Sequence, residues 1–463
     1  MVDKDFLLQK IWGSWTGKIA GGTFAMPVEG KNRNYITNLY PPLSGWSKHH
    51  SQAVNDDEQY ELISLLALEA LSDDEFANRL KAGTIFEPEF LGSYWLKYLL
   101  PQYVFTAEKA AYENAKNGVP WEHAGDYVYE YDGKVNGNEF ADWIGAQMKG
   151  ELYGMLLPAW GWYDAKGEKK NPKDDLEILK HCLDLSLQDA LIAHRDVGIV
   201  GELFISAMIS VAITHKQYEY KEEIKFPESE ISKWEIDSNS PKGFKVEKEK
   251  FDGFSQQINQ IGICSETIIR DIKRIKAVLL EFASLIDSIS VEDVILYFSF
   301  IDPIIDNFIN KPDSSDWVTV WKICNGLWWD FEGDMIKNAI PKFKDYPIIL
   351  EKRLQTIRFS KNVHTLFNNS AIVIGLLYGD GDFMQTVRIS TDCGCDTDCN
   401  AGNAGAIIGA YLGQDLIPSY AKRFIRGEII PGLKEWSDKS LLNLSQRTLT
   451  QALRFETLKK SLE

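Results

Sequence analysis

Two carboxylates, Asp396 and Asp398, stand one residue apart in a turn rich in glycine and cysteine. We expect the small residues that follow to form a helix, so that both carboxylates lie at its start. Two such groups repel each other there, and an N-cap uses only one of them. The helix N-terminus offsets part of the repulsion through its free N–H groups. A hard divalent cation such as Mg²⁺ would offset the rest.

A second polar cluster, at Asn55, Asp56 and Asp57, opens another predicted helix near the beginning of the chain. Taken alone, such residues at a helix start are caps more often than ligands. Taken with the first pair, they would supply oxygen ligands for one or two hard cations from opposite ends of the chain. The lone carboxylate of Glu29, which follows a Gly-rich segment, is by itself typical of a solvated loop.

Three of the six cysteines, Cys393, Cys395 and Cys399, fall in the same turn as the carboxylate pair. Thiolates select soft metals, so a zinc or iron–sulfur site has to be weighed. No C-x-x-C pair is present and the nearest histidine in the sequence is His364, which favours small buried thiols instead. Cys399 would then lie beside a cation without being its main ligand. Six cysteines in a chain of 463 residues indicate reduced thiols and a cytoplasmic protein.

The composition is that of an ordinary globular protein, with 44% hydrophobic and 25% charged residues. A net charge of −17 argues against nucleic-acid and anionic-membrane partners, whose sites need clustered Lys and Arg. The first residues show no signal-peptide pattern, and no apolar run approaches the roughly 20 residues that a membrane helix needs. The sequence sets no oligomeric state.

Apolar residues recur with helical spacing along most of the chain, which predicts an all-α architecture. A charged segment with several Pro and Gly residues, 216–262, is predicted to be a surface insertion that is irregular or contains a hairpin. Gly405, Gly409 and Gly413 recur every four residues, which indicates a helix that passes close to another backbone. The helices are expected at Asp56–Leu71, Glu89–Leu100, Thr106–Asn117, Glu139–Leu157, Leu176–His194, Gly201–Thr214, Thr267–Ile289, Ser370–Tyr378, Ala401–Leu412 and Leu441–Leu458.

These motifs together resemble the ADP-ribosylglycohydrolase family. Gly17–Glu29 is similar to its N-terminal signature G-x-x-x-G-D-x-x-G-x-x-x-E, with two substitutions. Asn55–Asp57 falls where the family usually has Thr-Asp-Asp, and Gly394–Asn400 is similar to G-x-D-T-D-T/C-N. Further segments resemble a bacterial branch of the family, and with them the similarity spans about two thirds of the chain in family order: Phe105–Gly118, Ile144–Gly154, Asp189–Ala212 and His364–Phe383.

The resemblance implies a compact multi-helix orthogonal bundle, formed as one domain over residues 1–463, with a metal site at the floor of a cleft. It implies one or two Mg²⁺ ions and a hydrolase that cleaves a ribosyl bond. The substrate would be an ADP-ribosylated protein or a small ADP-ribosyl, nucleoside-like or related glycoside. Glu29 would assist bond cleavage, and the loop with Gly198, Gly201 and Glu202 would line the substrate pocket. The metal positions would be Asn55, Asp56, Asp57, Asp396, Asp398 and Cys399.

Several positions depart from the family pattern. Gly22 replaces the usual Asp, Ala25 the usual Gly and Asn55 the usual Thr. Glu58 and Cys399 stand where the ADP-ribosyl-acceptor hydrolases of this family have Thr. Because a thiol is a poor ligand for Mg²⁺, one metal position would be weak, differently coordinated or empty. Two alternatives stay open: a non-catalytic ADP-ribose- or nucleotide-binding protein on the same scaffold, and a metal-dependent phosphohydrolase. No P-loop is present and no histidine adjoins either acidic cluster, which argues mildly against the second.

Overall fold

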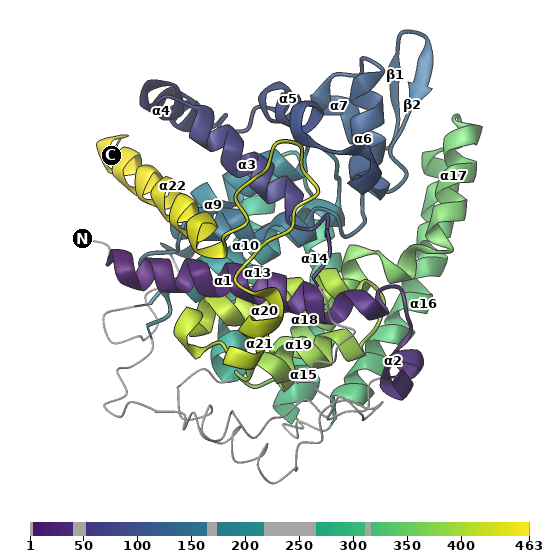
Figure 1. The fold of residues 1–463 in the computed structure, drawn as a ribbon. Coiled ribbons are helices and arrows are strands. Elements are labelled where there is room, and N and C mark those ends of the chain that lie inside the picture. Colours follow the sequence, from purple (N-terminus) through teal and green to yellow (C-terminus); the bar gives the residue numbers. More distant parts are fainter. Residues whose placement is uncertain (1–2, 40–51, 164–173, 217–264, 311–315, 463) are drawn as a thin grey trace.

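The computed structural model describes residues 3–39, 52–163, 174–216, 265–310 and 316–462. Its only sheet within these ranges is a two-stranded antiparallel hairpin of β1 (Tyr129–Tyr131) and β2 (Lys134–Asn136), so the predicted all-α fold is confirmed (Figure 1). The α-helices are α1 (Lys4–Ala25), α2 (Arg33–Leu39), α3 (Gln59–Ala70), α4 (Asp73–Ala82), α5 (Pro88–Tyr98), α6 (Thr106–Lys116), α7 (Trp121–Ala124), α8 (Glu151–Leu156), α9 (Asp175–Ala190), α10 (Val197–Thr214), α13 (Ser265–Ala283), α14 (Val291–Ser299), α15 (Asp302–Asn310), α16 (Trp317–Lys342), α17 (Pro347–Ile357), α18 (Thr365–Tyr378), α19 (Phe383–Asp392), α20 (Thr397–Leu412), α21 (Ser419–Ile425) and α22 (Leu441–Leu462).

Nine of the ten predicted helices agree with the structure apart from their ends. The prediction over Glu139–Leu157 is wrong for its first half, where the chain forms turns before α8. The cause is long-range hydrogen bonding, because the N–H of Ile144 donates to the carbonyl of Val363 at 2.9 Å and that of Arg195 to the carbonyl of Ala141 at 2.9 Å. The apolar spacing there reports burial of a turn against the core.

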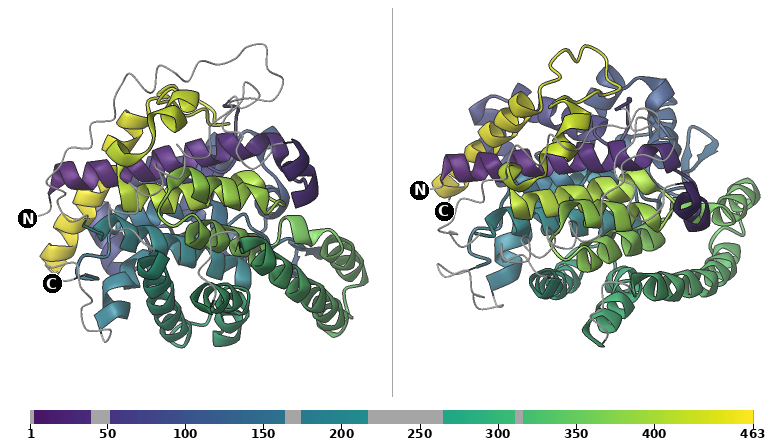
Figure 2. Two further views of the ribbon diagram at one scale, coloured as in Figure 1. Left: turned by 90° about the horizontal axis from the view of Figure 1, so that it is seen from below. Right: turned by 60° about the horizontal axis from the view of Figure 1, so that its bottom comes forward.

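Some helices were not predicted from the sequence, and one predicted segment cannot be compared with the structure. The sequence did not single out α16, whose buried side chains are few along its 26 residues, or the neighbouring α17; both project from the bundle (Figures 1 and 2). The predicted insertion 216–262 lies outside the described residues apart from Lys216, and the observed hairpin is elsewhere, between α7 and α8.

The centre of the fold is an antiparallel pair, α1 and α20, which lie side by side in each view (Figures 1 and 2). Glycines on α1 face small residues on α20 at every turn of contact. A Cβ at Gly17 would lie 2.0 Å from the carbonyl oxygen of Gly405, and one at Gly13 would lie 2.4 Å from that of Gly409. The close backbone approach predicted from the glycine spacing is therefore confirmed, and α1 is the partner.

Gly17→Ala is expected to lower the free energy of unfolding by about 1–3 kcal/mol, because backbone atoms, which cannot rotate away, occupy the space of the new methyl group. Gly326→Ala is a matched control on α16, where a Cβ meets no atom within 4 Å. It should instead stabilise the protein by roughly 0.5–1 kcal/mol through helix propensity. Urea denaturation measures both variants, and equal stabilities would contradict the close packing of α1 on α20.

The helices around this pair share one hydrophobic core. Its buried side chains run from Leu7 in α1 to Phe455 in α22. Helix α10 lies in the middle, and all 18 of its residues are buried. It is long and apolar enough to cross a membrane by length and composition alone, so the expectation that no apolar run approaches that length is wrong for this helix. Its burial among the other helices is that of a core helix. The single-domain prediction also covers residues outside the described ranges and stays a prediction.

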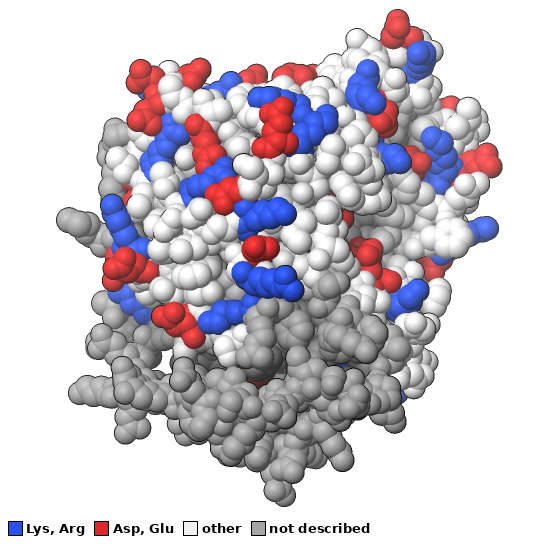
Figure 3. Space-filling view, in the orientation of Figure 1, with Lys and Arg blue, Asp and Glu red and all other residues white. Residues whose placement is uncertain are grey.

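The surface carries charges of both signs. On the face shown in Figure 3, Lys and Arg side chains are interspersed with Asp and Glu, and no large patch of one sign covers the part that the structure describes. Exposed ion pairs such as that of Arg447 with Glu69, at 2.7 Å, belong to this mixed surface. The expected absence of nucleic-acid and membrane partners stays a prediction.

Candidate metal centre and active site

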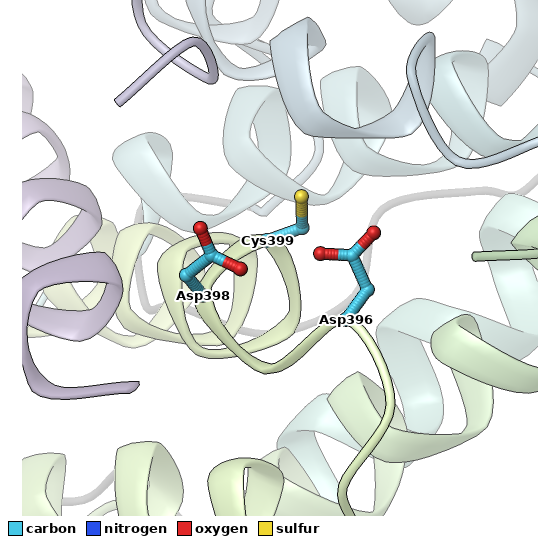
Figure 4. A group of neighbouring side chains, drawn as sticks. All are labelled: Asp396, Asp398 and Cys399. Carbon is cyan, nitrogen blue, oxygen red and sulfur yellow. The ribbon is translucent and has the colours of Figure 1, made fainter. Parts of the chain in front are cut away.

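The structure brings the two predicted acidic clusters together at the start of α20. The carboxylate oxygens of Asp396 and Asp398 and the sulfur of Cys399 lie within 4.8 Å of one another, with the two carboxylates directed to the same space (Figure 4). From the other end of the chain, Asp57 accepts a hydrogen bond through its Oδ1 from the Cys399 thiol at 3.2 Å. Residues separated by more than three hundred positions therefore share one site.

The turn before α20 fixes this arrangement. Gly394 and Cys395 both adopt left-handed backbone angles, with φ of 82° and 70°. The N–H of Cys395 donates to the carbonyl of Lys31 at 3.0 Å, and the N–H of Gly30 donates to the carbonyl of Cys395 at 2.9 Å. These two bonds tie the segment after Glu29 to the turn, which explains why the Glu29 carboxylate faces the cluster.

Two departures from the family pattern are neighbours in space. A Cβ at Gly22 would lie 3.4 Å from the side-chain amide nitrogen of Asn55. The amide oxygen of Asn55 accepts a hydrogen bond from the N–H of Asp57 at 3.2 Å, so the side chain stabilises the turn that carries the acidic residues. Asn55 thus lies at the site, with its oxygen engaged by the chain, and its role as a ligand stays a prediction.

The cluster has a strong excess of negative charge. Burial, followed by the charge of Asp57, raises the pKa of Asp398 to about 7. Burial and neighbouring carboxylates also hold the pKa values of Asp57 and Asp396 well above their ordinary range. The Asp398 carboxylate, followed by desolvation, raises the pKa of Glu29 to about 7. Such a set of groups is unfavourable in its ionised form unless a cation is shared among them.

The residues present fit a divalent cation. One oxygen of Asp398, Oδ1, is buried and has no hydrogen-bond partner, although the carboxylate is in reach of Asp396 and Cys399. Buried polar atoms are nearly always paired, so an unpaired oxygen among converging carboxylates indicates room for a bound ion. Carboxylate oxygens are the ligands that Mg²⁺ prefers, and the sulfur of Cys399 is the one soft atom in the set.

Exposure changes across the site. Asp57 and Asp398 are buried, Asp56 is half-buried, and Glu29 is exposed. The side of the cluster nearest to solvent is therefore the one with Glu29 and Asp56. A surface hollow of about 570 Å³, lined mainly by α13, contains none of these residues, so the cleft implied by the resemblance stays a prediction.

Lys18 is a residue at the back of the site that sequence reasoning missed. Its ammonium is buried and donates to Glu61 at 2.6 Å, to Glu151 at 2.9 Å and to the carbonyl of Met148 at 2.6 Å. The same charge lowers the pKa of Asp57 against the effect of burial. A lysine inside the Gly-rich, largely apolar second half of α1 was the available signal, because buried lysines are nearly always paired.

Glu108 was also missed. Burial raises its pKa to about 7, and its charge in turn raises the pKa of Asp56. Its carboxylate occupies the space that a side chain at position 145 would take, since a Cβ at Gly145 would lie 2.1 Å from its Oε1. The Nε2 atom of His194 lies 3.6 Å from the same Oε1 atom. Only packing reveals this neighbour, because Glu108 lies on the buried face of an otherwise ordinary amphipathic helix.

The predicted substrate loop is a helix. Gly198, Gly201 and Glu202 lie in the first turns of α10, so the loop expectation is wrong. Glu202 is buried, forms an ion pair with Lys149 at 3.5 Å and accepts a hydrogen bond from Ser186 at 3.2 Å. The structure gives Glu202 a partner in the core, and the role of all three residues toward substrate stays a prediction.

The cluster predicts a specific pH dependence without added cations. Raised carboxylate pKa values mean that the folded state holds more protons than the unfolded state between the ordinary values, 3.8 for Asp398 and 4.5 for Glu29, and about 7. Stability is therefore lost as the pH rises through this window. In EDTA, we expect wild type to lose more stability than Asp398→Asn between about pH 5 and 8. Thermal melts measure the difference, and parallel curves would contradict it.

Comparison with known proteins indicates the family of this chain. The profile of the family described as ADP-ribosylglycohydrolase matches residues 3–268 and 336–451, which leaves most of α13, all of α14 and α15, and most of α16 outside the match. A solved structure described as an ADP-ribosylglycohydrolase-related protein complex aligns over 98% of this chain and 98% of its own, at 14% identity and a TM-score of 0.39. No curated protein matches the chain. Since the family profile covers more than half of the sequence, the chain belongs to the ADP-ribosylglycohydrolase family.

Proposed function

We propose that this protein is a metal-dependent hydrolase that cleaves an N- or O-glycosidic ribosyl bond of an ADP-ribosyl, nucleoside-like or related substrate. Membership of a glycohydrolase family supports the reaction class. The observation that carries the proposal is the position of Glu29: an exposed carboxylate beside Asp398, at the open edge of a buried cluster of acids. A carboxyl group of raised pKa beside a second carboxyl group is typical of glycoside hydrolysis.

The residues that would hold Mg²⁺ are Asp56, Asp57, Asp396 and Asp398, in one or two positions. Bound there, the ion would orient vicinal sugar hydroxyls and offset the charge of the carboxylates. Its support is the fit of the donor set and the unpaired Oδ1 of Asp398. The backbone ties at Gly30 and Cys395 would hold Glu29 in register with the ribose.

Glu29 would handle the proton and the charge at the ribosyl carbon. Hydrolysis passes through an oxocarbenium-like transition state. A nearby carboxylate either stabilises the positive charge of that state or acts as a general base that activates the attacking water. The charge of Asp398 is the main cause of the raised pKa of Glu29. Neutralising Asp398 in the loaded site would lower that pKa again, so Glu29 would be ionised and ready to accept a proton near neutral pH.

A hydrolysis screen with and without Mg²⁺ tests this function. It should include peptides ADP-ribosylated on Arg or Ser, nucleosides and simple glycosides, with chromatography of the sugar product and a separate phosphate assay. We expect Mg²⁺-dependent release of free ADP-ribose or ribose from at least one class. Release of inorganic phosphate from nucleotides would indicate a phosphohydrolase instead. Calorimetric binding of ADP-ribose without turnover of any substrate would indicate a binding protein.

A further inference from the structure

The sulfur of Cys399 occupies an unusual position within the acidic cluster. It lies within 4.8 Å of carboxylate oxygens of Asp396 and Asp398, and its thiol donates to Asp57 at 3.2 Å. On its other side, the thioether sulfur of Met148 lies 3.9 Å away. Both sulfur-bearing residues are buried, at 5% exposure each. A soft-donor corner therefore adjoins an otherwise all-oxygen site.

Sulfur and oxygen donors select different metals. Mg²⁺ requires small, hard oxygen ligands and gains little from a thiol, whereas Zn²⁺ and Co²⁺ bind thiolates and carboxylates together. An all-oxygen site would leave Cys399 as a passive neighbour. A site that uses Cys399 would prefer a thiophilic ion, because the sulfur–metal bond is available only to that class of metal.

A second observation is a carboxylate oxygen beside Cys399 that has no hydrogen-bond partner. The Oδ1 atom of Asp398 is buried and without a hydrogen-bond partner, while the Cys399 thiol donates a hydrogen bond to Oδ1 of Asp57. An ion placed among these atoms would pair the free oxygen of Asp398 and replace the S–H···O contact by bonds from both atoms to the metal.

We propose that the metal position at Cys399 takes a thiophilic divalent cation of the Zn²⁺ class in preference to Mg²⁺, with the Cys399 thiolate as a direct ligand beside Asp57, Asp396 and Asp398. On binding, the S–H bond breaks, the proton leaves to solvent, and the sulfur donates its electron pair to the metal. No oxidation or reduction takes place. The inference rests on the proposed use of the cluster as a metal centre. Asn55 and Asp56, the other predicted ligands, would then belong to a second metal position.

Cobalt substitution tests the inference on the wild-type protein. Metal-free protein, kept reduced and anaerobic, is titrated with Co²⁺ while the near-ultraviolet absorption is recorded. We expect a sulfur-to-cobalt charge-transfer band that rises with occupancy, together with release of protons into a weakly buffered solution. Absence of this band at saturating Co²⁺, or failure of Co²⁺ to bind, overturns the inference without reference to any variant.

Cys399→Ser isolates the contribution of the sulfur, because it keeps the size of the side chain and a donor toward Asp57. Loss of a residue that only orients a ligand already costs about 10–100-fold in metal affinity. We therefore expect the variant to bind Zn²⁺ at least tenfold more weakly than wild type and to lose the cobalt band, with Mg²⁺ affinity unchanged or increased. Competition with a chromophoric chelator measures the affinities.

Cys182→Ser is the matched control, since Cys182 is also buried but lies on α9, where its thiol contacts the carbonyl of Ser206 in α10 at 3.7 Å. It should keep the band and the Zn²⁺ affinity. A tight preference of wild type for Zn²⁺ over Mg²⁺ is expected of most sites and decides nothing by itself. Equal Zn²⁺ affinity in wild type and Cys399→Ser overturns the inference. Mg²⁺-dependent hydrolysis without a cobalt band overturns it while the proposed function stands.

Discussion

Glu29→Gln is expected to lower kcat by about 10²–10⁴-fold on the substrate that the hydrolysis screen identifies, while the affinity for Mg²⁺ stays that of wild type. The amide keeps the shape of the side chain and removes its capacity to accept a proton or carry charge. Because Glu29 is exposed at the edge of the site, the substitution removes no buried contact. The effect should therefore lie in turnover, and the stability of the Mg²⁺-loaded protein should be nearly unchanged.

Three measurements separate this role from a structural one. Steady-state kinetics should show the loss in kcat, with little change in KM. The limb of the pH–rate profile that reports Glu29 should disappear in the variant, since its carboxyl titrates at about 7 before a cation is bound. Calorimetry should give equal Mg²⁺ affinities. Glu113→Gln, an exposed carboxylate on α6, is the matched control and should keep wild-type rates.

A rate within a few-fold of wild type in Glu29→Gln would remove Glu29 from the mechanism. A large loss in both Mg²⁺ affinity and rate would have a different meaning. In that case Glu29 would be a metal ligand through its proximity to Asp398, and the group that handles the proton would have to be sought elsewhere, with the half-buried Asp56 as the first candidate.

Asp398→Asn is expected to abolish the stabilisation that divalent cations give to the folded protein. A ligand at 100 times its Kd stabilises the native state by about 2.7 kcal/mol. Asp398 is central to the cluster, because its charge raises the pKa values of Glu29, Asp56 and Asp396. Replacing its carboxylate by an amide removes a charged ligand. Saturating Mg²⁺ should therefore raise the free energy of unfolding of wild type by this amount and that of the variant hardly at all.

The metal-free proteins should behave in the opposite order. At about pH 8 Asp398→Asn should be the more stable of the two, since the variant no longer buries a charge among other carboxylates. Thermal melts with EDTA and with saturating Mg²⁺ measure both effects. Asp382→Asn is the matched control: Asp382 is also buried, caps α19 through Gln385 at 2.7 Å, and can be replaced by another good cap. Equal Mg²⁺-induced shifts in all three proteins would contradict a metal role for Asp398.

Much of the fold could be read from the sequence, because helical periodicity reports which face of a segment is buried. The spacing predicted α5 and α6 nearly to their ends, and the glycines of α20 predicted close contact with another backbone. The same signal failed over Glu139–Leu157, where apolar residues are buried by turns. Periodicity measures burial, and the hydrogen bond from Ile144 to Val363 that prevents a helix there crosses more than two hundred positions.

The site too was predictable only in part. The sequence by itself determined its chemistry, since carboxylates at two helix starts and a carboxylate after a Gly-rich helix can be recognised from residue type and spacing. Only the tertiary structure decided which groups surround them: Lys18 behind Asp57, Glu108 beside Asp56, and Glu202 paired away in the core. The reason is physical. Charge and hydrogen bonding act through space, and the neighbours that set the pKa of a buried group come from elements whose distance along the chain carries no information about contact.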